Sequence, residues 1–365
     1  MAKLGEVCLL KAGKFVSAND ISPEYNKGLY PCFGGNGIRG YVADYTHDGE
    51  FPLIGRQGAL CGNVNLASGK FHATEHAVVV QPKIEMNVHW LYYALNAMNL
   101  GQYATGAAQP GLAVSKLETL SIEIPNISEQ NKIAQTLYKV EQLVNFRKQQ
   151  LAKLDELVKA RFVEMFGTFP ANPFRWSIGK IQDVVSDVRY GSSRPAVEGG
   201  KYPYLRMNNI TYSGELDLRD TKRIDIPDSE LDKCTVRRGD VLFNRTNSKE
   251  LVGKTCVYNR DELMVLAGFV IRVRINERIR PEVLSAFLNM DFSKRMLIGM
   301  CKTAIGQVNI NAKELQNIDL YIPPIELQDQ FVTLKNKIDQ QKQTVQQSLE
   351  KLELLKKALM QEYFG

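Results

Sequence analysis

Two stretches of the chain decide its fold. Residues 124–167 read IPNISEQNKIAQTLYKVEQLVNFRKQQLAKLDELVKARFVEMFG, and residues 322–365 read IPPIELQDQFVTLKNKIDQQKQTVQQSLEKLELLKKALMQEYFG. The likeness begins earlier, because residues 105–167 align without a gap with residues 303–365, and 19 of the 63 aligned pairs are identical. A repeat this long is no solenoid and indicates two copies of one unit, each a globular part followed by the duplicated segment.

Each duplicated segment predicts one long helix. An Ile-Pro pair opens it, and a run of about 39 residues then continues without Gly or Pro until Gly167 or Gly365. At 1.5 Å per residue such a helix is roughly 58 Å long. Apolar residues recur at helical spacing on both. The residues predicted to pair the helices are Leu137, Val140, Val144, Leu151, Leu154 and Val158 in the first and Ile338, Val345, Leu352 and Leu359 in the second.

Two matched apolar seams in one chain most simply bury each other, and an intermolecular coiled coil is the alternative. An antiparallel pair is favoured, because a parallel pair would need about 135 residues of domain to travel back along the rod. The expected fold is therefore mixed α/β: two globular domains alternating with two long helices that pair as an antiparallel coiled coil, with an internal pseudo-twofold repeat.

The globular parts combine short alternating runs with turn signals. The stretch 29–45 is expected to form a strand, a glycine turn and a strand, and 51–65 and 70–81 to continue in the same manner. Further strands are expected in 202–210, 240–244 and 269–275, and helices in 90–100 and 281–290. The predicted division is a first domain 1–108, a repeat segment 109–167, a second domain 168–306 and a repeat segment 307–365.

Composition sets the outer bounds. With 365 residues, 44% of them hydrophobic, and no apolar run of membrane-spanning length, the chain is expected to be soluble. The N-terminal residues lack the features of a secretory signal, so a cytoplasmic location is predicted. The six cysteines show no C-x-x-C pair and no zinc-like spacing, which favours free thiols.

The net charge of +6 is unevenly distributed, because residues 168–302 hold 23 basic against 17 acidic side chains. This excess fits a polyanion partner and also an ordinary basic surface.

Two enzyme-like motifs fail on context. Residues 35–40 satisfy G-x-G-x-x-G, but a strand-like run follows where a phosphate site needs a helix. His72 and His76 match H-x-x-E-H, yet the β-branched run after them does not place both on one helical face. The sequence also contains no recognisable nucleophile, base and orienting group. We therefore predict no catalytic residue and no metal site in this chain.

The loops of both globular parts are rich in groups suited to nucleic acid. Arg pairs with guanine, Asn with adenine, and Ser, Thr or Lys reach phosphates, although Asn, Ser and Gly also simply make turns. The predicted DNA-binding residues are Asn36, Arg39, Arg56, Gln57, Asn63, Asn65 and Lys70 in the first part and Arg189, Tyr190, Ser193, Arg194, Arg206, Asn208, Asn209, Asn244, Arg245, Asn247 and Lys254 in the second.

The whole chain resembles the DNA-specificity subunits of type I restriction-modification systems. The twin segments 109–167 and 307–365 carry the resemblance, with their Ile-Pro openings, long helices and Phe-Gly ends. Residues 30–37 and 55–64 resemble one subtype of target recognition domain, and residues 239–245 with 252–254 resemble another.

The resemblance implies that each globular domain reads one half of a bipartite, asymmetric DNA site, with the helices setting the spacing. It also implies that the helices dock two modification subunits, which bind S-adenosylmethionine and methylate adenine. Two restriction subunits would use ATP with Mg, and this chain itself would bind no cofactor. The competing hypothesis is a coiled-coil scaffold or adaptor without sequence-specific DNA readout, which would have no need of two diverged domains with Arg- and Asn-rich loops.

Overall fold

The structure is a computed structural model that describes residues 1–106, 110–301 and 308–365. By their internal contacts these residues form two compact units, Met1–Lys148 with Gln347–Gly365, and Gln149–Gln346. Each unit holds one globular domain and parts of both long helices. The predicted boundaries at 108/109 and 306/307, and Gln109 and Gln307 beside them, lie outside the described residues.

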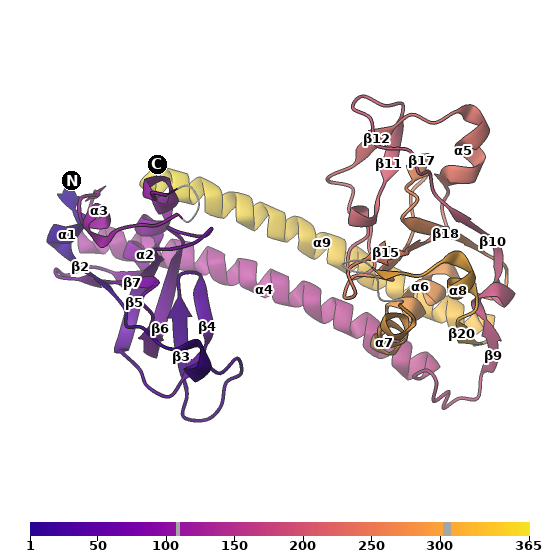
Figure 1. Cartoon of the computed structure of the whole chain (residues 1–365), viewed down its shortest axis with the longest axis horizontal. Helices are drawn as coiled ribbons and strands as arrows, with labels where there is room; N and C mark the ends of the chain where they lie inside the picture. Colours follow the sequence, from indigo (N-terminus) through magenta and orange to yellow (C-terminus); the bar gives the residue numbers. More distant parts are fainter. Residues whose placement is uncertain (107–109, 302–307) are drawn as a thin grey trace. The chain divides into compact units, whose positions relative to one another are not determined.

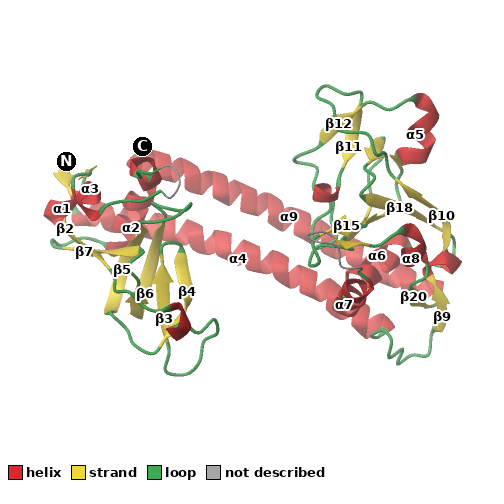
Figure 2. Ribbon diagram, in the orientation of Figure 1, coloured by secondary structure: helices red, strands yellow, loops and turns green. Residues whose placement is uncertain are grey.

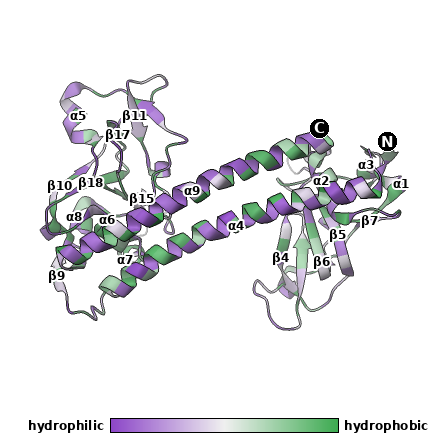
Figure 3. Ribbon diagram, turned by 180° about the vertical axis from the view of Figure 1, so that it is seen from behind, coloured by the Kyte–Doolittle hydropathy of each residue, from purple (hydrophilic) through white to green (hydrophobic). Residues whose placement is uncertain are grey.

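The two long helices are α4, Ile127–Phe166, and α9, Ile325–Phe364, with 40 residues each. Both begin directly after the predicted proline signal. Asn126 caps α4, because its Oδ1 accepts a hydrogen bond from the Glu129 amide at 3.0 Å. Gly167 follows α4 with a φ of +84°, a conformation that glycine adopts without strain. Apolar and polar residues are interspersed along both helices (Figure 3). Buried apolar residues recur at helical spacing, Leu137, Val140 and Val144 on α4 and Phe331, Ile338 and Val345 on α9, which confirms the two predicted amphipathic helices.

The first domain is built on one six-stranded sheet, in the order β2-β7-β5-β6-β3-β4. Its elements are labelled in Figure 1. They are β1 (Ala2–Lys3), α1 (Leu4–Val7), β2 (Cys8–Ala12), η1 (Ala18–Asp20), β3 (Tyr30–Gly34), β4 (Gly37–Val42), β5 (His47–Gly55), β6 (Val64–Ala73), β7 (Ala77–Pro82), α2 (Val88–Ala97), η2 (Leu100–Tyr103), α3 (Val114–Glu118) and β8 (Ser121–Ile122).

The second domain divides its strands between two four-stranded sheets, β10-β18-β14-β16 and β12-β11-β17-β13, and two short strand pairs, β15-β19 and β20-β9. Figure 2 shows these strands in yellow. The elements are β9 (Ser177–Lys180), η3 (Ile181–Val184), β10 (Val185–Tyr190), β11 (Tyr202–Leu205), η4 (Met207–Asn209), β12 (Lys222–Ile224), α5 (Asp228–Cys234), β13 (Thr235–Val236), β14 (Val241–Asn244), β15 (Thr246–Asn247), β16 (Thr255–Val257), β17 (Met264–Leu266), β18 (Val270–Ile275), α6 (Pro281–Asn289), α7 (Asp291–Met300), β19 (Val308–Asn309), α8 (Ala312–Gln316) and β20 (Asp319–Ile322).

The two domains share a strand topology. In the first, β2 pairs with β7 and β7 with β5, both antiparallel; in the second, β10 pairs with β18 and β18 with β14 in the same way. A parallel pairing ties a further strand pair to each arrangement, β3 with β6 in the first domain and β11 with β17 in the second. The long strand β6 of the first domain, which lies in one continuous sheet, corresponds to the strands β16 and β17 of the second, which lie in two separate sheets. The second domain also adds α5 and β13, and the loops of the two domains differ.

A buried glutamine ties each long helix to the domain before it. The Oε1 of Gln130 accepts a hydrogen bond from the amide of Asn87, which caps α2, at 2.9 Å, and its Nε2 donates to the Pro125 carbonyl. Gln328, 198 positions later, accepts from the amide of Arg280, which caps α6, at 2.8 Å. Its Nε2 donates to the carbonyl of Pro323, the counterpart of Pro125. The same set of hydrogen bonds from a buried glutamine therefore occurs in both units, and we call Gln130 and Gln328 with these bonds the polar latches.

Each unit also brings the start of one long helix beside the end of the other. In the first, Lys356 Nζ lies 2.8 Å from Glu141 Oε1, and Lys148 Nζ lies 3.0 Å from Glu353 Oε1. In the second, Lys342 pairs with Asp155, and the rings of Phe162 and Phe331 are 5.5 Å apart. Within each unit the residue number rises on α4 as it falls on α9.

The residues predicted to pair the helices divide by burial. Leu137, Val140, Val144, Ile338 and Val345 are buried, whereas Leu151, Leu154, Val158, Leu352 and Leu359 are half-buried. Three of them pack against domain cores: Leu137 and Leu359 with the first, and Val158 with the second. These three residues of the apolar seam therefore also attach the long helices to the domain cores.

The strand and turn predictions agree with the structure in two stretches and need a new bound in a third. The stretch 51–65 is the end of β5, a loop in which Gly58 and Gly62 take φ values of +87° and +88°, and the start of β6. The stretch 70–81 is likewise the end of β6, a turn and β7. The strand predicted at 202–210 ends at Leu205, because the side chain of Asn209 accepts from the Arg206 amide and folds the following residues into a turn.

Candidate nucleic-acid interface

The loop after β14 holds two of the predicted residues of the second domain, Arg245 and Asn247. Thr246 and Asn247 form β15, which pairs with β19, so this loop runs beside the duplicated segment. Arg245 precedes them. Its guanidinium lies over the ring of Tyr190, 4.7 Å from the centroid, and its Nη1 makes a long 3.4 Å contact with the Gly268 carbonyl. Tyr190 is fixed in turn, because its hydroxyl accepts a hydrogen bond from the Ala312 amide at 2.8 Å.

The loop after β5 is the counterpart in the first domain. Gln57 forms an isolated bridge with Gly111, and Arg56 accepts a hydrogen bond from the Leu112 amide at 2.9 Å through its main-chain carbonyl. Arg56 is half-buried and Gln57 is exposed. In the residues that the structure describes, the guanidinium of Arg56 has no carboxylate partner.

Three other predicted arginines are already paired with carboxylates. Arg189 Nε lies 2.9 Å from Asp187 Oδ1, and Arg206 Nη2 lies 2.9 Å from Asp220 Oδ2. Arg194 makes two hydrogen bonds to Glu230, the shorter 2.7 Å, and they lower the pKa of the Glu230 carboxyl. Pairs this exposed are weak, so DNA could displace the carboxylates, but only in competition with them.

The glycine turn of β3 and β4 presents the predicted residues of the first hairpin. Asn36 and Arg39 are exposed there, and Asn36 Oδ1 accepts a hydrogen bond from Asn63 Nδ2 at 2.9 Å. Asn65 lies on β6. Lys70, further along β6, lies 4.6 Å from the ring centroid of Tyr45. Asn36 and Asn65 line one pocket, whereas Lys70 lies five residues further along the strand, on its other face.

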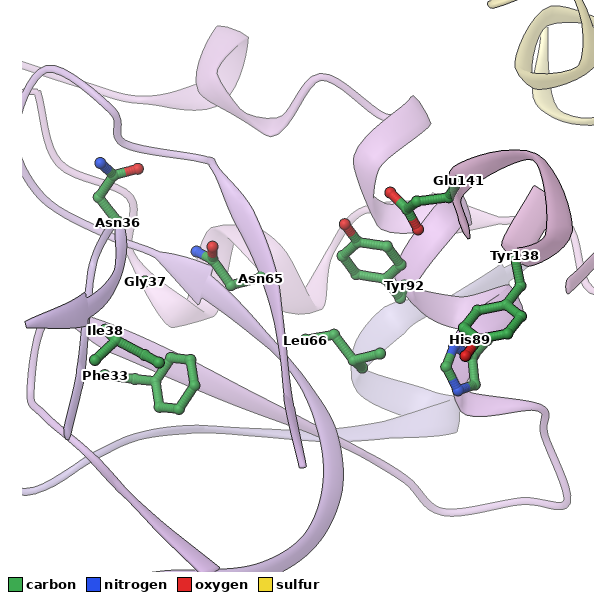
Figure 4. Close-up of a pocket in the computed structure, with 10 residues that line it drawn as sticks. All are labelled: Phe33, Asn36, Gly37, Ile38, Asn65, Leu66, His89, Tyr92, Tyr138 and Glu141. Atoms are coloured by element: carbon green, nitrogen blue, oxygen red, sulfur yellow. The ribbon is translucent and has the colours of Figure 1, made fainter. Parts of the chain in front are cut away.

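A pocket of about 540 Å³ lies between this hairpin and the helices α2 and α4. Figure 4 shows Asn36 and Asn65 at one side of it and Tyr92, His89 and Glu141 at the other. Glu141 accepts a hydrogen bond from the Tyr93 hydroxyl at 2.9 Å. Glu141 also pairs with Lys356 at 2.8 Å, and the residues that line the pocket include no Lys or Arg, so the pocket does not continue a basic surface.

Three further predicted residues of the second domain are exposed or half-buried. Ser193 and Asn208 are exposed, and Asn247 is half-buried, with its Oδ1 accepting from the Ser248 amide at 2.9 Å. None of these side chains is committed to a carboxylate in the described residues.

The structure corrects three of the predicted DNA contacts. Asn244 is 0% exposed, Asn209 is 2% exposed and Lys254 is 8% exposed. Asn209 donates to the carbonyls of Asp217 and Asp220, and Lys254 Nζ donates to the Met207 carbonyl at 3.1 Å. Burial lowers the pKa of Lys254. Side chains this deep cannot reach DNA without local rearrangement, so we place them in the framework of the loops.

The two histidines of the H-x-x-E-H stretch contact different groups. His72 is buried, with Nε2 3.2 Å from the Lys14 carbonyl, while His76 lies 3.2 Å from its neighbour Glu75. In residues 1–106, 110–301 and 308–365 there is no group of three metal-ligating side chains. All six cysteines are free, and five are buried. No helix among the described residues has the length and apolarity to cross a membrane.

Sequence reasoning missed the buried glutamines Gln130 and Gln328 and the half-buried Lys294. Gln130 was visible as one of the residues repeated at a shift of 198, and that recurrence was the available signal. Lys294 gave no such signal. Its Nζ donates to the Gly253 carbonyl at 2.5 Å, and burial, with Lys159 and Lys254 nearby, lowers its pKa to about 7.

The family model of the type I restriction modification DNA specificity domain matches residues 1–156 and 175–354. The chain belongs to this family. A relative with the name type I restriction enzyme EcoprrI specificity subunit, from Escherichia coli, is 53% identical over 143 residues, which are 39% of this chain and 36% of the relative. The EcoKI specificity subunit of Escherichia coli K12 is 22% identical over 67% of this chain and 56% of its own length. The matches thus span about a third to a half of these relatives.

Solved structures of the same family share the fold. The type I restriction-modification S subunit of M. genitalium aligns over 100% of this chain and 95% of its own, with a TM-score of 0.63 and 18% identity. A chain from a study of complex assembly and conformational transition in a type I system aligns over 100% and 96%, with a TM-score of 0.56 and 17% identity. At this identity the likeness concerns the fold alone.

Proposed function

We propose that this chain is the DNA-specificity subunit of a type I restriction-modification complex and that each globular domain reads one half of a bipartite, asymmetric site. One observation carries the proposal: two domains of one strand topology bear different loops, and each is followed by the same 40-residue helix. A shared topology suits a shared mode of docking on DNA. Different loops suit different half-sites, because base edges are read by the side chains that reach them.

The two long helices pair antiparallel along their length and set the spacing between the half-sites. The ion pairs of Glu141 with Lys356 and of Asp155 with Lys342 support this direction within each unit. If the two domains contact groove segments on one face of DNA, the helices must hold the domains about one turn of the DNA helix apart.

The helices also dock two modification subunits. Exposed apolar side chains on each helix support a docking role: α4 exposes Leu143 and Phe146, and α9 exposes Leu354 and Leu355. Such side chains mark interaction surfaces when they gather on one element. The chain itself is non-catalytic in this proposal. S-adenosylmethionine is bound by the modification subunits and ATP with Mg by restriction subunits, all in the cytoplasm, where the DNA lies.

The test is selection and sequencing of random duplex DNA retained by this chain, co-purified with its modification subunit at near-physiological salt. We expect two unlike short motifs at one fixed spacing. Recovery of no motif, with only salt-sensitive binding, would overturn sequence recognition and favour the scaffold hypothesis instead.

A further inference from the structure

Arg56 and Arg245 occupy the same position in the two domains. Each comes directly after the strand that pairs with β7 or β18, and each is held by two main-chain hydrogen bonds. The amide of Arg56 donates to the His76 carbonyl at 3.0 Å, and that of Arg245 donates to the Phe269 carbonyl at 3.0 Å. Both acceptors lie in the turn that leads into the neighbouring strand.

The second main-chain bond joins each arginine to the duplicated segment. The Arg56 carbonyl accepts from the Leu112 amide and the Arg245 carbonyl from the Ile310 amide, both at 2.9 Å. Leu112 and Ile310 are 198 positions apart and both are buried. Each arginine is therefore fixed at the joint between a recognition domain and the segment that leads into a long helix.

Both guanidinium groups lack a counter-charge. Neither Arg56 nor Arg245 forms an ion pair in the described residues, and the Nε of each is buried without a hydrogen-bond partner. Nearby arginines differ: Arg194 and Arg206 have carboxylate partners. Arg245 has only neutral partners, the Tyr190 ring and the Gly268 carbonyl. A half-buried, permanently charged group without a counter-charge is costly, and an anion beside it would reduce that cost.

We infer that Arg56 and Arg245 are matched phosphate anchors, one for the DNA backbone at each half-site. Guanidinium groups bind phosphate through their planar fork of donors. A base contact is disfavoured, because the same residue in the same main-chain frame would impose the same base on two domains whose loops differ. The inference rests on the proposed function and assigns to these arginines the positioning of each domain on DNA, apart from sequence reading.

The test uses the full chain in complex with its modification subunit, and two duplexes: the selected site and a scrambled sequence of the same length. Arg56→Gln and Arg245→Gln should each weaken binding to both duplexes by a similar factor, about five- to tenfold near 0.1 M salt. Each should also reduce the slope of log affinity against log salt by about 1. The recovered motifs should not change.

Matched controls are Lys83→Gln and Arg278→Gln, which remove one exposed charge at the far end of β7 or β18. We expect both controls to bind like the unmodified complex. Arg56→Lys and Arg245→Lys should keep the salt slope, and they also test the anchors if the glutamine variants unfold.

The outcomes separate the two proposals. Equal binding of both duplexes by the unmodified complex would remove the proposed function itself. If that complex prefers its site, normal affinity in both glutamine variants would overturn the anchors, and so would a changed base preference in one half-motif.

Discussion

Gln130 and Gln328 each stabilise the attachment of a long helix to the domain before it through buried hydrogen bonds. Gln328 satisfies the Arg280 amide and the carbonyls of Arg278 and Pro323. A buried polar group that loses its partner costs about 1–3 kcal/mol. Gln328→Met keeps the volume and removes these bonds, so we expect a loss of about 1–3 kcal/mol, measured by chemical denaturation. Gln340→Met, at an exposed position of the same helix, is the control and should change stability by less than about 0.5 kcal/mol. Equal stability of the two variants would contradict a structural role for the latch.

Lys294 makes the second domain sensitive to pH. Its pKa is lowered to about 7, chiefly by burial and further by Lys159 and Lys254. The unfolded chain keeps an ordinary lysine pKa near 10.4, so between about pH 7 and 10 the unfolded state binds more protons. Lys294 therefore makes a contribution to stability that rises with pH across this window, by at most about 1.4 kcal/mol per pH unit.

The variant Lys294→Met removes this titration. We expect it to be more stable than the unmodified chain at pH 7, with an advantage that shrinks toward pH 10, as thermal midpoints would report. Arg295→Gln alters an exposed neighbour and should show no such trend. An advantage that stayed constant with pH would rule out the titration of Lys294 as its cause.

At the scale of elements, the two faces of α9 differ in energetic weight. Leu349 is 6% exposed and Leu354 is 69% exposed on the same helix. Leu349→Ala should cost about 2–5 kcal/mol through lost burial and an unfilled cavity. Leu354→Ala should cost less than about 0.5 kcal/mol. Chemical denaturation of the two variants measures the difference in free energy of unfolding. Similar losses in both variants would show that Leu349 is not part of the buried seam.

The exposed apolar side chains of the long helices carry the docking proposal. Phe146→Ser removes one of them and should weaken retention of the modification subunit in co-purification, with little change in thermal midpoint. Phe15→Ser changes an aromatic residue of the first domain that is 76% exposed, and it should leave retention intact. Undiminished retention by Phe146→Ser would remove this side chain from the docking surface.

At the scale of the whole molecule, the two domains should be independent readers. We expect exchange of residues 168–302 for the matching segment of another specificity subunit to change one half-motif and keep the other. Selection of random duplexes with the exchanged chain measures this. The latches at Gln130 and Gln328 keep each domain tied to its own helix, so the spacing should also persist. A scaffold would keep its partners and have no motif to change.

The bounds of α4 and α9 were determined by the sequence alone, because proline and glycine punctuation and heptad spacing are local signals. The duplication was readable for the same reason. Burial of Asn244 was decided only by the tertiary structure, since its strand β14 pairs with β18, which is remote in the chain. The equivalent positions of Arg56 and Arg245 were also visible only in the tertiary structure. They are 189 positions apart, outside the 198-residue shift of the repeat, and their likeness lies in main-chain bonds to Leu112 and Ile310. Insertions of unequal length shift residue numbers, but strand pairing keeps the positions equivalent.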